Sequence, residues 1–411
     1  MEVLVIRRIS REGQSAINLE GGLMSAASHT VKEKEYIKLE LLKAYLEPLF
    51  MIIGQKAPRV CYVDCSAEPW GKDGQKPEST PVAVSLGIIE KCHNALSEQF
   101  RKYVQFRALF IERDSESFDR LENFLKTESW SGVDANCLKG DFCDLQKQIL
   151  SWCGDRDFCL YFIDAAEWRH IALQNLGPLM ARPSSEFLMN LLFDSTRSPR
   201  GLPSLEEHMK AVLGGAPGVS GDAALEGDRL LTSLYRRELK ACAPIIGGAI
   251  PRCAHMRVLP GGKSRTVSEL VYLTWDPLGV VAFMEASERL ENEQRKMLAL
   301  AVQSEKVKRS RQLEIFSADK LIGDSTSADP AEVKEYWLAR LSSTPKQFGV
   351  SEFADMLEET GWFMDDFQKA FLDLEREGKV RNLGSTGMRT GNPVRYWLNG
   401  NRGELLEKTV D

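Results

Sequence analysis

Short apolar runs alternate with segments of helical spacing through the first half of the chain. Three runs are apolar enough to form strands buried on both faces, and each ends in an acid: Arg59–Asp64, Ala108–Glu112 and Phe158–Asp164. Other segments place apolar residues three or four apart, which predicts helices at Lys34–Phe50, Ser79–Glu90 and Ser115–Lys126. Ser79 or Thr80 can cap the second of these helices, with Pro81 at its first position.

The alternation of strands and helices predicts right-handed crossovers and a mainly parallel sheet. The expected fold class is therefore α/β, with a Rossmann-like, methyltransferase-type doubly wound sheet. A weaker strand around Cys137 would add a further member to this sheet. Ligands of such sheets bind beyond the carboxyl ends of the strands. The acids expected at that edge are Asp64, Glu112, Asp141 and Asp164.

Further along, the pattern predicts two helices, a strand and a long charged helix, at Ser185–Arg197, Asp228–Cys242, Leu270–Thr274 and Glu285–Gln312. Residues 318–330 have the composition of a linker. We therefore expect residues 1–317 to form a methyltransferase-like Rossmann domain with insertions, and residues 331–411 to form a second domain.

The second domain is predicted to contain three helices and a hairpin, which is the order of a winged helix. The helices are expected at Glu332–Leu341, Ser351–Glu359 and Asp365–Glu377, and the hairpin strands at Val380–Leu383 and Val394–Leu398. The wing is basic, with Lys379, Arg381, Arg389 and Arg395, so it could follow the phosphates of duplex nucleic acid. The third helix carries several acids that would repel such a backbone. A protein-docking or dimerisation module is the alternative.

Composition narrows the classes of protein. A formal net charge of −6 restricts any nucleic-acid contact to a local patch. The chain shows no signal-peptide pattern and no apolar run of bilayer length, so we expect a cytoplasmic protein with no membrane association. The nine cysteines lack a repeated CxxC spacing and are expected to be reduced thiols. Cys253 and His255 do not make a metal site by themselves, and no metal is expected.

The acids at the strand ends fit S-adenosylmethionine as cofactor. Asp64 would lie near its methionyl ammonium, in a loop that also carries Glu68 and Trp70. Glu112 would accept hydrogen bonds from the ribose hydroxyls. Asp141 would accept from the adenine amino group, and Phe142 would pack on the adenine ring.

The segment Asp164-Ala-Ala-Glu-Trp168 is the candidate catalytic turn. Asp164 could accept a hydrogen bond from a target amine, and Trp168 could stack on its base. The two prolines typical of amino-methylating enzymes are absent from this turn. Cytosine C5 methylation requires a cysteine nucleophile, usually after a proline, and the chain has no Pro-Cys pair, which excludes that chemistry.

Several segments together resemble the three-Cys-motif partner (TcmP) family. They are Lys38–Phe50, Tyr62–Leu86, Phe162–Trp168, Phe187–Arg197 and, above all, Tyr272–Met284. The resemblance covers most of the chain and implies a methyltransferase-like fold. It also implies a partner protein that carries three cysteines, so the cysteines of this chain are not that motif.

The chain departs from the family pattern at both turns of the presumed site. Glu68 and Trp70 stand where the family's first loop has glycines, and Ala165 and Ala166 stand in the turn where the family has a proline and an aromatic residue. We therefore expect a degenerate cofactor site in a subunit that binds nucleic acid or protein. The alternatives are an active S-adenosylmethionine-dependent methyltransferase and a purely protein-docking module.

Overall fold

The computed structural model describes residues 26–67, 80–165, 168–194, 224–258, 266–310, 328–383 and 403–409. The described residues fall into two compact units, which divide between Asp276 and Pro277. We call them the sheet unit, up to Asp276, and the C-terminal unit, from Pro277. The long helix α9 (Pro277–Ser310) belongs to the C-terminal unit. The predicted domain boundaries stay a prediction.

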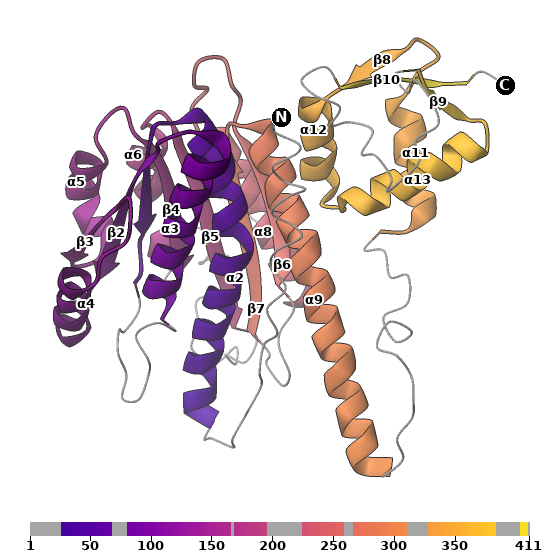
Figure 1. The fold of residues 1–411 in the computed structure, drawn as a ribbon. Helices are drawn as coiled ribbons and strands as arrows, with labels where there is room; N and C mark the ends of the chain where they lie inside the picture. Colours follow the sequence, from indigo (N-terminus) through magenta and orange to yellow (C-terminus); the bar gives the residue numbers. More distant parts are fainter. Residues whose placement is uncertain are drawn as a thin grey trace. The chain divides into compact units, whose positions relative to one another are not determined.

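The sheet unit is built on a seven-stranded sheet of order β3-β2-β1-β4-β5-β7-β6 (Figure 1). Its strands are β1 (Arg59–Asp64), β2 (Gln105–Glu112), β3 (Val133–Lys139), β4 (Phe158–Ala165), β5 (Ser185–Asp194), β6 (Arg252–Val258) and β7 (Thr266–Thr274). Strands β1 to β5 are parallel, and β7 runs antiparallel to β5 and β6. The strand order reverses between β1 and β4, as in a doubly wound sheet. With the antiparallel β7 inserted, this is the order of methyltransferase-type Rossmann folds, and the predicted α/β class is confirmed.

Helices lie on both faces of this sheet (Figure 1). They are α2 (Ala26–Lys56), α3 (Pro81–Phe100), α4 (Ser115–Thr127), α5 (Phe142–Cys153), the short η2 (Trp168–Ile171), α6 (Leu173–Met180) and α8 (Ala224–Cys242). On β1 the side chains alternate between the faces. Tyr62 meets Phe50 of α2, whereas Cys61 and Val63 belong to a buried cluster with residues of α5, α6 and α8.

Local signals explain why several elements begin where they do. The Thr80 hydroxyl accepts from the N–H of Ala83, and Pro81 occupies the first position of α3, as predicted. Asp114 and Asp141 cap α4 and α5 in the same way. Helix α2 does not stop near Pro48 but continues to Lys56.

One expectation about the second half of the sheet was wrong. The segment from Ser185 forms the interior strand β5 rather than a helix. Its run from Phe187 to Leu191 is buried, and a strand covered on both faces has no period that separates it from a buried helix. Strand β6 was also not predicted, because five of its seven residues are buried and its sequence alternates only weakly.

The C-terminal unit contains three helices beside α9 and a small antiparallel sheet of order β8-β10-β9. After α9 come α11 (Pro330–Arg340), β8 (Lys346–Phe348), α12 (Val350–Thr360), α13 (Met364–Arg376), β9 (Val380–Asn382) and β10 (Glu404–Lys408). Trp337 is fully buried, and its ring meets Phe348, Phe367 and Phe371. Its indole N–H donates to the Phe367 carbonyl over 3.0 Å.

The hairpin prediction needs correction. Strand β9 pairs with β10, which begins at Glu404, later in the chain than expected. The predicted partner, Val394–Leu398, lies outside the described residues, and β8 was missed because it has only three residues. Among the helices that the structure describes, none has an apolar stretch long enough to cross a bilayer.

Candidate functional site

The predicted acids lie together at the carboxyl edge of the parallel strands. Asp64 ends β1 and is in register with Phe110 of β2 and Phe162 of β4. Glu112 ends β2, and Asp164 is the penultimate residue of β4. Asp141 follows β3 as the cap of α5. The sequence therefore predicted correctly which edge gathers these carboxylates.

Asp64 is ion-paired with a lysine that the sequence analysis did not select. Lys38 of α2 places its ammonium 3.2 Å from the Asp64 carboxylate, and both side chains are fully buried. The same ammonium donates to the Ser66 carbonyl and lies 5.4 Å from the centre of the Phe162 ring. Ser66 in turn donates its N–H to Asp64 Oδ1 over 3.1 Å. A buried carboxylate at the end of β1 is thus already neutralised from within the chain.

A signal for Lys38 was present in the sequence. It lies three and four residues before Leu41 and Leu42, which are fully buried, so helical spacing places it on the buried face of α2. Lysine is seldom buried without a partner, so sequence alone favours a solvated position for it. The partner, Asp64, is 26 residues away in the sequence.

The Glu112 carboxylate is buried, and only one of its two oxygens accepts a hydrogen bond within the described residues. Its Oε1 accepts from the Asp114 N–H over 2.8 Å. Its Oε2 is buried and has no hydrogen-bond partner among the described residues. Burial raises the pKa of the Glu112 carboxyl above its usual value, against the opposing effect of the Asp114 and Arg113 N–H groups. A buried, open acceptor at the end of β2 is what a ligand hydroxyl would fill.

Asp141 and Phe142 contact other side chains of the sheet unit. Asp141 Oδ1 accepts from the Cys143 N–H over 3.0 Å, and Oδ2 lies 3.0 Å from His170 Nε2 and also pairs with Arg169. Burial alone raises the Asp141 pKa, but the hydrogen bonds from His170, Cys143 and Arg169 outweigh it and hold the pKa below its usual value. The Phe142 ring is buried with its centre 5.3 Å from that of His170.

Asp141, Cys143 and His170 also bring three ligand-type atoms within 4.8 Å of one another. A cation there would compete with the guanidinium of Arg169 for the same Asp141 oxygen. The group is better described as an ionic network that fixes η2 to the start of α5 than as a metal centre.

The candidate catalytic residues are only partly described. Asp164 is buried, and its Oδ1 accepts from the Asn190 side chain over 3.0 Å. Asn190 accepts in turn from the Ser268 hydroxyl, so a polar chain runs across β4, β5 and β7. Trp168 begins η2, but its side chain is not among those described. Glu68 and Trp70 lie outside the described residues.

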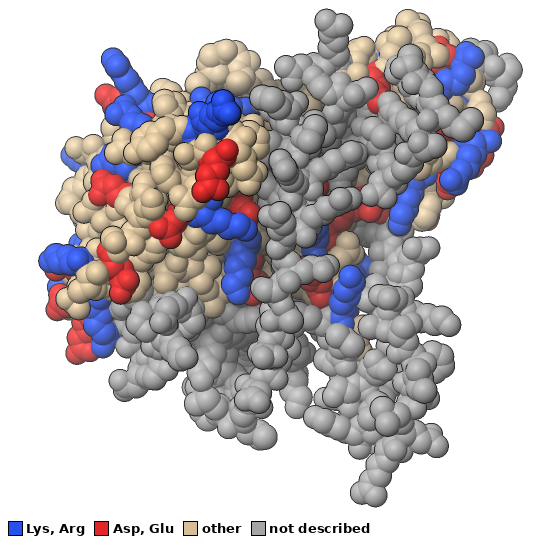
Figure 2. All heavy atoms as spheres, viewed as in Figure 1, with Lys and Arg blue, Asp and Glu red and all other residues tan. Residues whose placement is uncertain are grey.

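The structure describes two of the four basic residues of the predicted wing, Lys379 and Arg381. Arg389 and Arg395 lie outside the part of the chain that the structure describes. Lys379 pairs with Glu377 at 2.8 Å, and Arg381 pairs with Glu407 at 2.6 Å. Glu377 also binds Lys334, and these two lysines lower its pKa to about 2. Figure 2 shows charges of both signs interspersed over the described surface that it displays.

Comparisons with known proteins give no close relative. No family model matches the chain, and no curated protein matches it. Membership in the three-Cys-motif partner family therefore stays a prediction.

Many solved structures overlap loosely with the chain, and three of them show the level of similarity. Protein LPL1258 of Legionella pneumophila is 10% identical, with 63% of this chain and 91% of that chain covered and a TM-score of 0.36. An O-methyltransferase of Bacillus cereus in complex with SAH is 10% identical, covering 66% and 88%, with a TM-score of 0.30. Human methyltransferase-like protein 13 in complex with SAH is 12% identical, covering 62% and 92%, with a TM-score of 0.31. Scores this low assign neither fold nor function, so the fold follows from the strand order itself.

Proposed function

We propose that this chain is a methyltransferase-fold binding subunit whose S-adenosylmethionine site is altered at its methionine end. The observation that carries the proposal is the buried Lys38–Asp64 pair. Asp64 is the acid expected beside the methionyl ammonium, and Lys38 already supplies an ammonium to it. A second ammonium beside Lys38 would meet a like charge at low dielectric, where repulsion is strong.

The part of the expected cofactor site that would bind the adenosine moiety keeps one feature of a binding site. Glu112 Oε2 is a buried acceptor without a partner among the described residues, and a ribose diol would satisfy it. This feature also supports the second candidate function, an active S-adenosylmethionine-dependent methyltransferase in which Asp164 and Trp168 engage the acceptor. The two candidates differ in whether the methionine moiety adds affinity.

Calorimetry of the full chain with adenosine, S-adenosylmethionine and S-adenosylhomocysteine separates them. We expect adenosine to bind at least as tightly as the two methionine-bearing ligands. Glu112→Ala should weaken adenosine binding about tenfold or more, since a hydrogen bond to a charged group contributes about 1.5–3 kcal/mol. Glu122→Ala, which removes an exposed acid of α4, is the matched control.

The outcomes distinguish the proposals. If S-adenosylmethionine binds much more tightly than adenosine, the methionine end is functional and the enzyme is the better account. In Lys38→Met, the altered-site proposal expects S-adenosylmethionine to gain affinity relative to adenosine. If the wild type and Lys38→Met prefer the same ligand to the same degree, Lys38 does not determine the preference between S-adenosylmethionine and adenosine.

For the C-terminal unit we propose a winged helix that docks a protein. The supporting observations are the element order α11-β8-α12-α13-β9-β10 and the sheet order β8-β10-β9. The ion pairs of Lys379 and Arg381 favour a protein partner over duplex nucleic acid. The resemblance noted above suggests a three-Cys-motif protein as that partner, and mixing the two purified proteins in sedimentation experiments tests it.

A further inference from the structure

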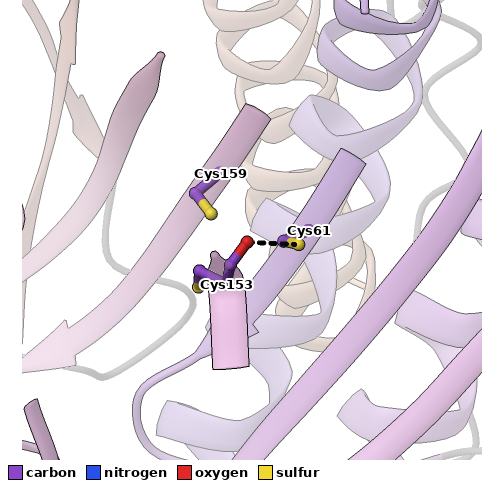
Figure 3. A group of neighbouring side chains, drawn as sticks. All are labelled: Cys61, Cys153 and Cys159. Atoms are coloured by element: carbon purple, nitrogen blue, oxygen red, sulfur yellow. Dashed lines mark hydrogen bonds between the residues drawn. The ribbon is translucent and has the colours of Figure 1, made fainter. Parts of the chain in front are cut away.

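Three cysteines that are far apart in the sequence converge inside the sheet unit. Cys61 of β1 and Cys159 of β4 are register partners on neighbouring strands, and Cys153 is the last residue of α5. Their sulfur atoms all lie within 4.8 Å of one another, and all three side chains are fully buried (Figure 3). We call this group the thiol triad.

Polar contacts join Cys153 to Cys61 and to Tyr161. The Tyr161 hydroxyl donates to Cys153 Sγ over 3.8 Å, and the Cys61 thiol donates to the Cys153 carbonyl over 3.9 Å. Hydrogen bonds from the Cys159 and Cys61 thiols lower the pKa of Cys153 to about 4, against the effect of burial. Burial raises the pKa of Cys159 well above its usual value.

Arg182 supplies a positive charge to the same region. It is buried, and its guanidinium donates to the backbone carbonyls of Gly154 and Asp157, the segment that directly follows Cys153. Within the described residues it forms no ion pair with a carboxylate. A buried guanidinium that is bound only by neutral oxygens is costly, so an anion close by would stabilise it.

We propose that Cys61, Cys153 and Cys159 bind one thiophilic divalent cation, Zn²⁺, as three thiolate ligands. Thiolates are the preferred ligands of such ions, and the triad supplies three of the four ligands of a tetrahedral zinc site. The Asp157 carboxylate is a further donor, with Oδ2 4.0 Å from Cys61 Sγ, and to bind the metal this oxygen would exchange its 3.7 Å ion pair with Arg107.

The protons of this exchange are accounted for. Each triad member binds zinc as a thiolate, so every triad thiol that is protonated before zinc binds releases its proton to solvent as the metal enters. The three thiolates carry −3, and Zn²⁺ and the Arg182 guanidinium together carry +3.

The place of the triad indicates a structural role for the metal. Cys61 and Cys159 lie near the amino ends of β1 and β4, away from the carboxyl edge that gathers Asp64 and Glu112. A closed site of this kind must take its metal as the chain folds, so binding free energy adds to folding free energy. The triad has no signature in the sequence, because its members have neither a CxxC spacing nor a neighbouring histidine.

The test is to unfold the full chain, remove metal with a chelator, and refold it with and without one equivalent of Zn²⁺. We expect about one zinc bound per chain by atomic absorption and a higher unfolding temperature in the zinc-refolded sample. Calorimetry of the refolding mixture in buffers of different ionisation enthalpy should show that protons are released with zinc and not without it.

Variants locate the metal. Cys153→Ser and Cys159→Ala should lose the bound zinc and the zinc-dependent rise in unfolding temperature. Cys92→Ser is the matched control, because Cys92 is also buried but lies on α3, outside the triad. Zinc bound equally by Cys92→Ser and the wild type supports the proposal.

Two results would overturn it. One is a wild-type chain that refolds without retaining zinc and with an unchanged unfolding temperature. The other is zinc that is retained at full stoichiometry in Cys153→Ser and Cys159→Ala. If both variants fail to fold, the zinc and proton stoichiometries of the wild type still decide, because a simple buried-thiol core predicts zero for each.

Discussion

At the scale of single residues, Lys38 determines what the end of β1 can bind. Its ammonium and the Asp64 carboxylate are both fully buried, so neither charge can be solvated if the other is removed. Breaking a buried pair by removing one partner typically costs about 3–5 kcal/mol, because the remaining charge stays desolvated. The free energy of unfolding should therefore respond strongly to single changes here.

We predict that Lys38→Met lowers the free energy of unfolding by about 3 kcal/mol or more in urea titrations. Lys43→Met, which breaks an exposed pair with Glu40 on the same helix, should change it by less than about 0.5 kcal/mol. Adding Asp64→Asn to Lys38→Met should recover much of the loss, since no buried charge is then left alone. A double variant as unstable as Lys38→Met would show that packing, not charge, causes the effect.

The sequence identified the acids at this site but not what they contact. Asp64, Glu112 and Asp164 could be placed because each terminates an apolar run, and the ends of parallel strands share an edge. Lys38 and Asn190 could not be placed, because a partner distant in the sequence has no local signature. The open Oε2 of Glu112 likewise depends on packing that no pattern reveals.

At the scale of elements, the pairing of β5 with β7 contains a carboxyl group poised to titrate. Glu186 of β5 is buried, and it accepts hydrogen bonds from the Tyr272 and Thr274 hydroxyls of β7. Burial raises the pKa of Glu186 to about 7, although these two hydrogen bonds lower it and Lys56 adds to their effect. In the unfolded chain its pKa returns to about 4.3.

The native state therefore binds the Glu186 proton more tightly than the unfolded state does. Between these two pKa values the native chain holds more protons, so this group's contribution to stability is full below about pH 4 and is lost as pH rises through about 7. The difference in pKa corresponds to roughly 3–4 kcal/mol. We predict that Glu186→Gln reduces the decline in unfolding free energy between pH 5 and pH 8.

Urea titrations of the wild type and of Glu186→Gln at pH 5 and pH 8 measure this contribution. Glu98→Gln, at an exposed position of α3, is the control and should leave the decline unchanged. If the wild type and Glu186→Gln show the same pH dependence, Glu186 does not titrate in this range.

A second prediction at this scale concerns the junction of β8 and β10. Gly403 and Gly378 both have positive φ angles, of 65° and 73°. A Cβ on Gly403 would lie 1.9 Å from the Phe348 carbonyl oxygen, whereas one on Gly378 would meet nothing within 4 Å. Gly378→Ala should cost about 1–2 kcal/mol for its left-handed backbone, and Gly403→Ala should cost clearly more. Chemical denaturation followed by circular dichroism measures both, and equal losses would show that the backbone can shift at Gly403.

The sequence could distinguish a helix from a strand where one face of the element is buried and the other is exposed. The stripe of Phe367, Phe371 and Leu374 predicted α13, and all three side chains are buried. Strand β5 is covered on both faces, so its sequence carries no such contrast, and a helix was predicted in its place. Strand β6 alternates only weakly, because five of its seven residues are buried.

At the scale of the whole molecule, strand order and the thiol triad are the features least accessible from sequence. Alternating strands and helices predicted a doubly wound sheet, but the insertion of β7 between β5 and β6 follows from long-range pairing. The register of β1 with β4 sets Cys61 beside Cys159, and the end of α5 adds Cys153. Each of these contacts joins residues whose local patterns are unrelated.

Charge is the property of the whole chain that bears most on its partners. With a net charge of −6, binding to duplex nucleic acid requires a local excess of basic side chains. In the C-terminal unit, Lys379 and Arg381 are paired with Glu377 and Glu407. A phosphate would have to displace these carboxylates, so the two cations contribute little to duplex affinity in the wild type.

We therefore predict that changing both acids, Glu377→Gln with Glu407→Gln, strengthens binding of the full chain to a labelled DNA duplex. The plot of log affinity against log salt concentration should steepen by about 2, one unit for each released cation. Lys379→Ala with Arg381→Ala should leave wild-type affinity nearly unchanged. Fluorescence anisotropy at about 50 and 200 mM salt measures all three proteins. A large loss of affinity in the lysine and arginine variant would instead mean that these residues hold phosphates despite their acidic partners, and the protein-docking proposal for this unit would give way to duplex binding.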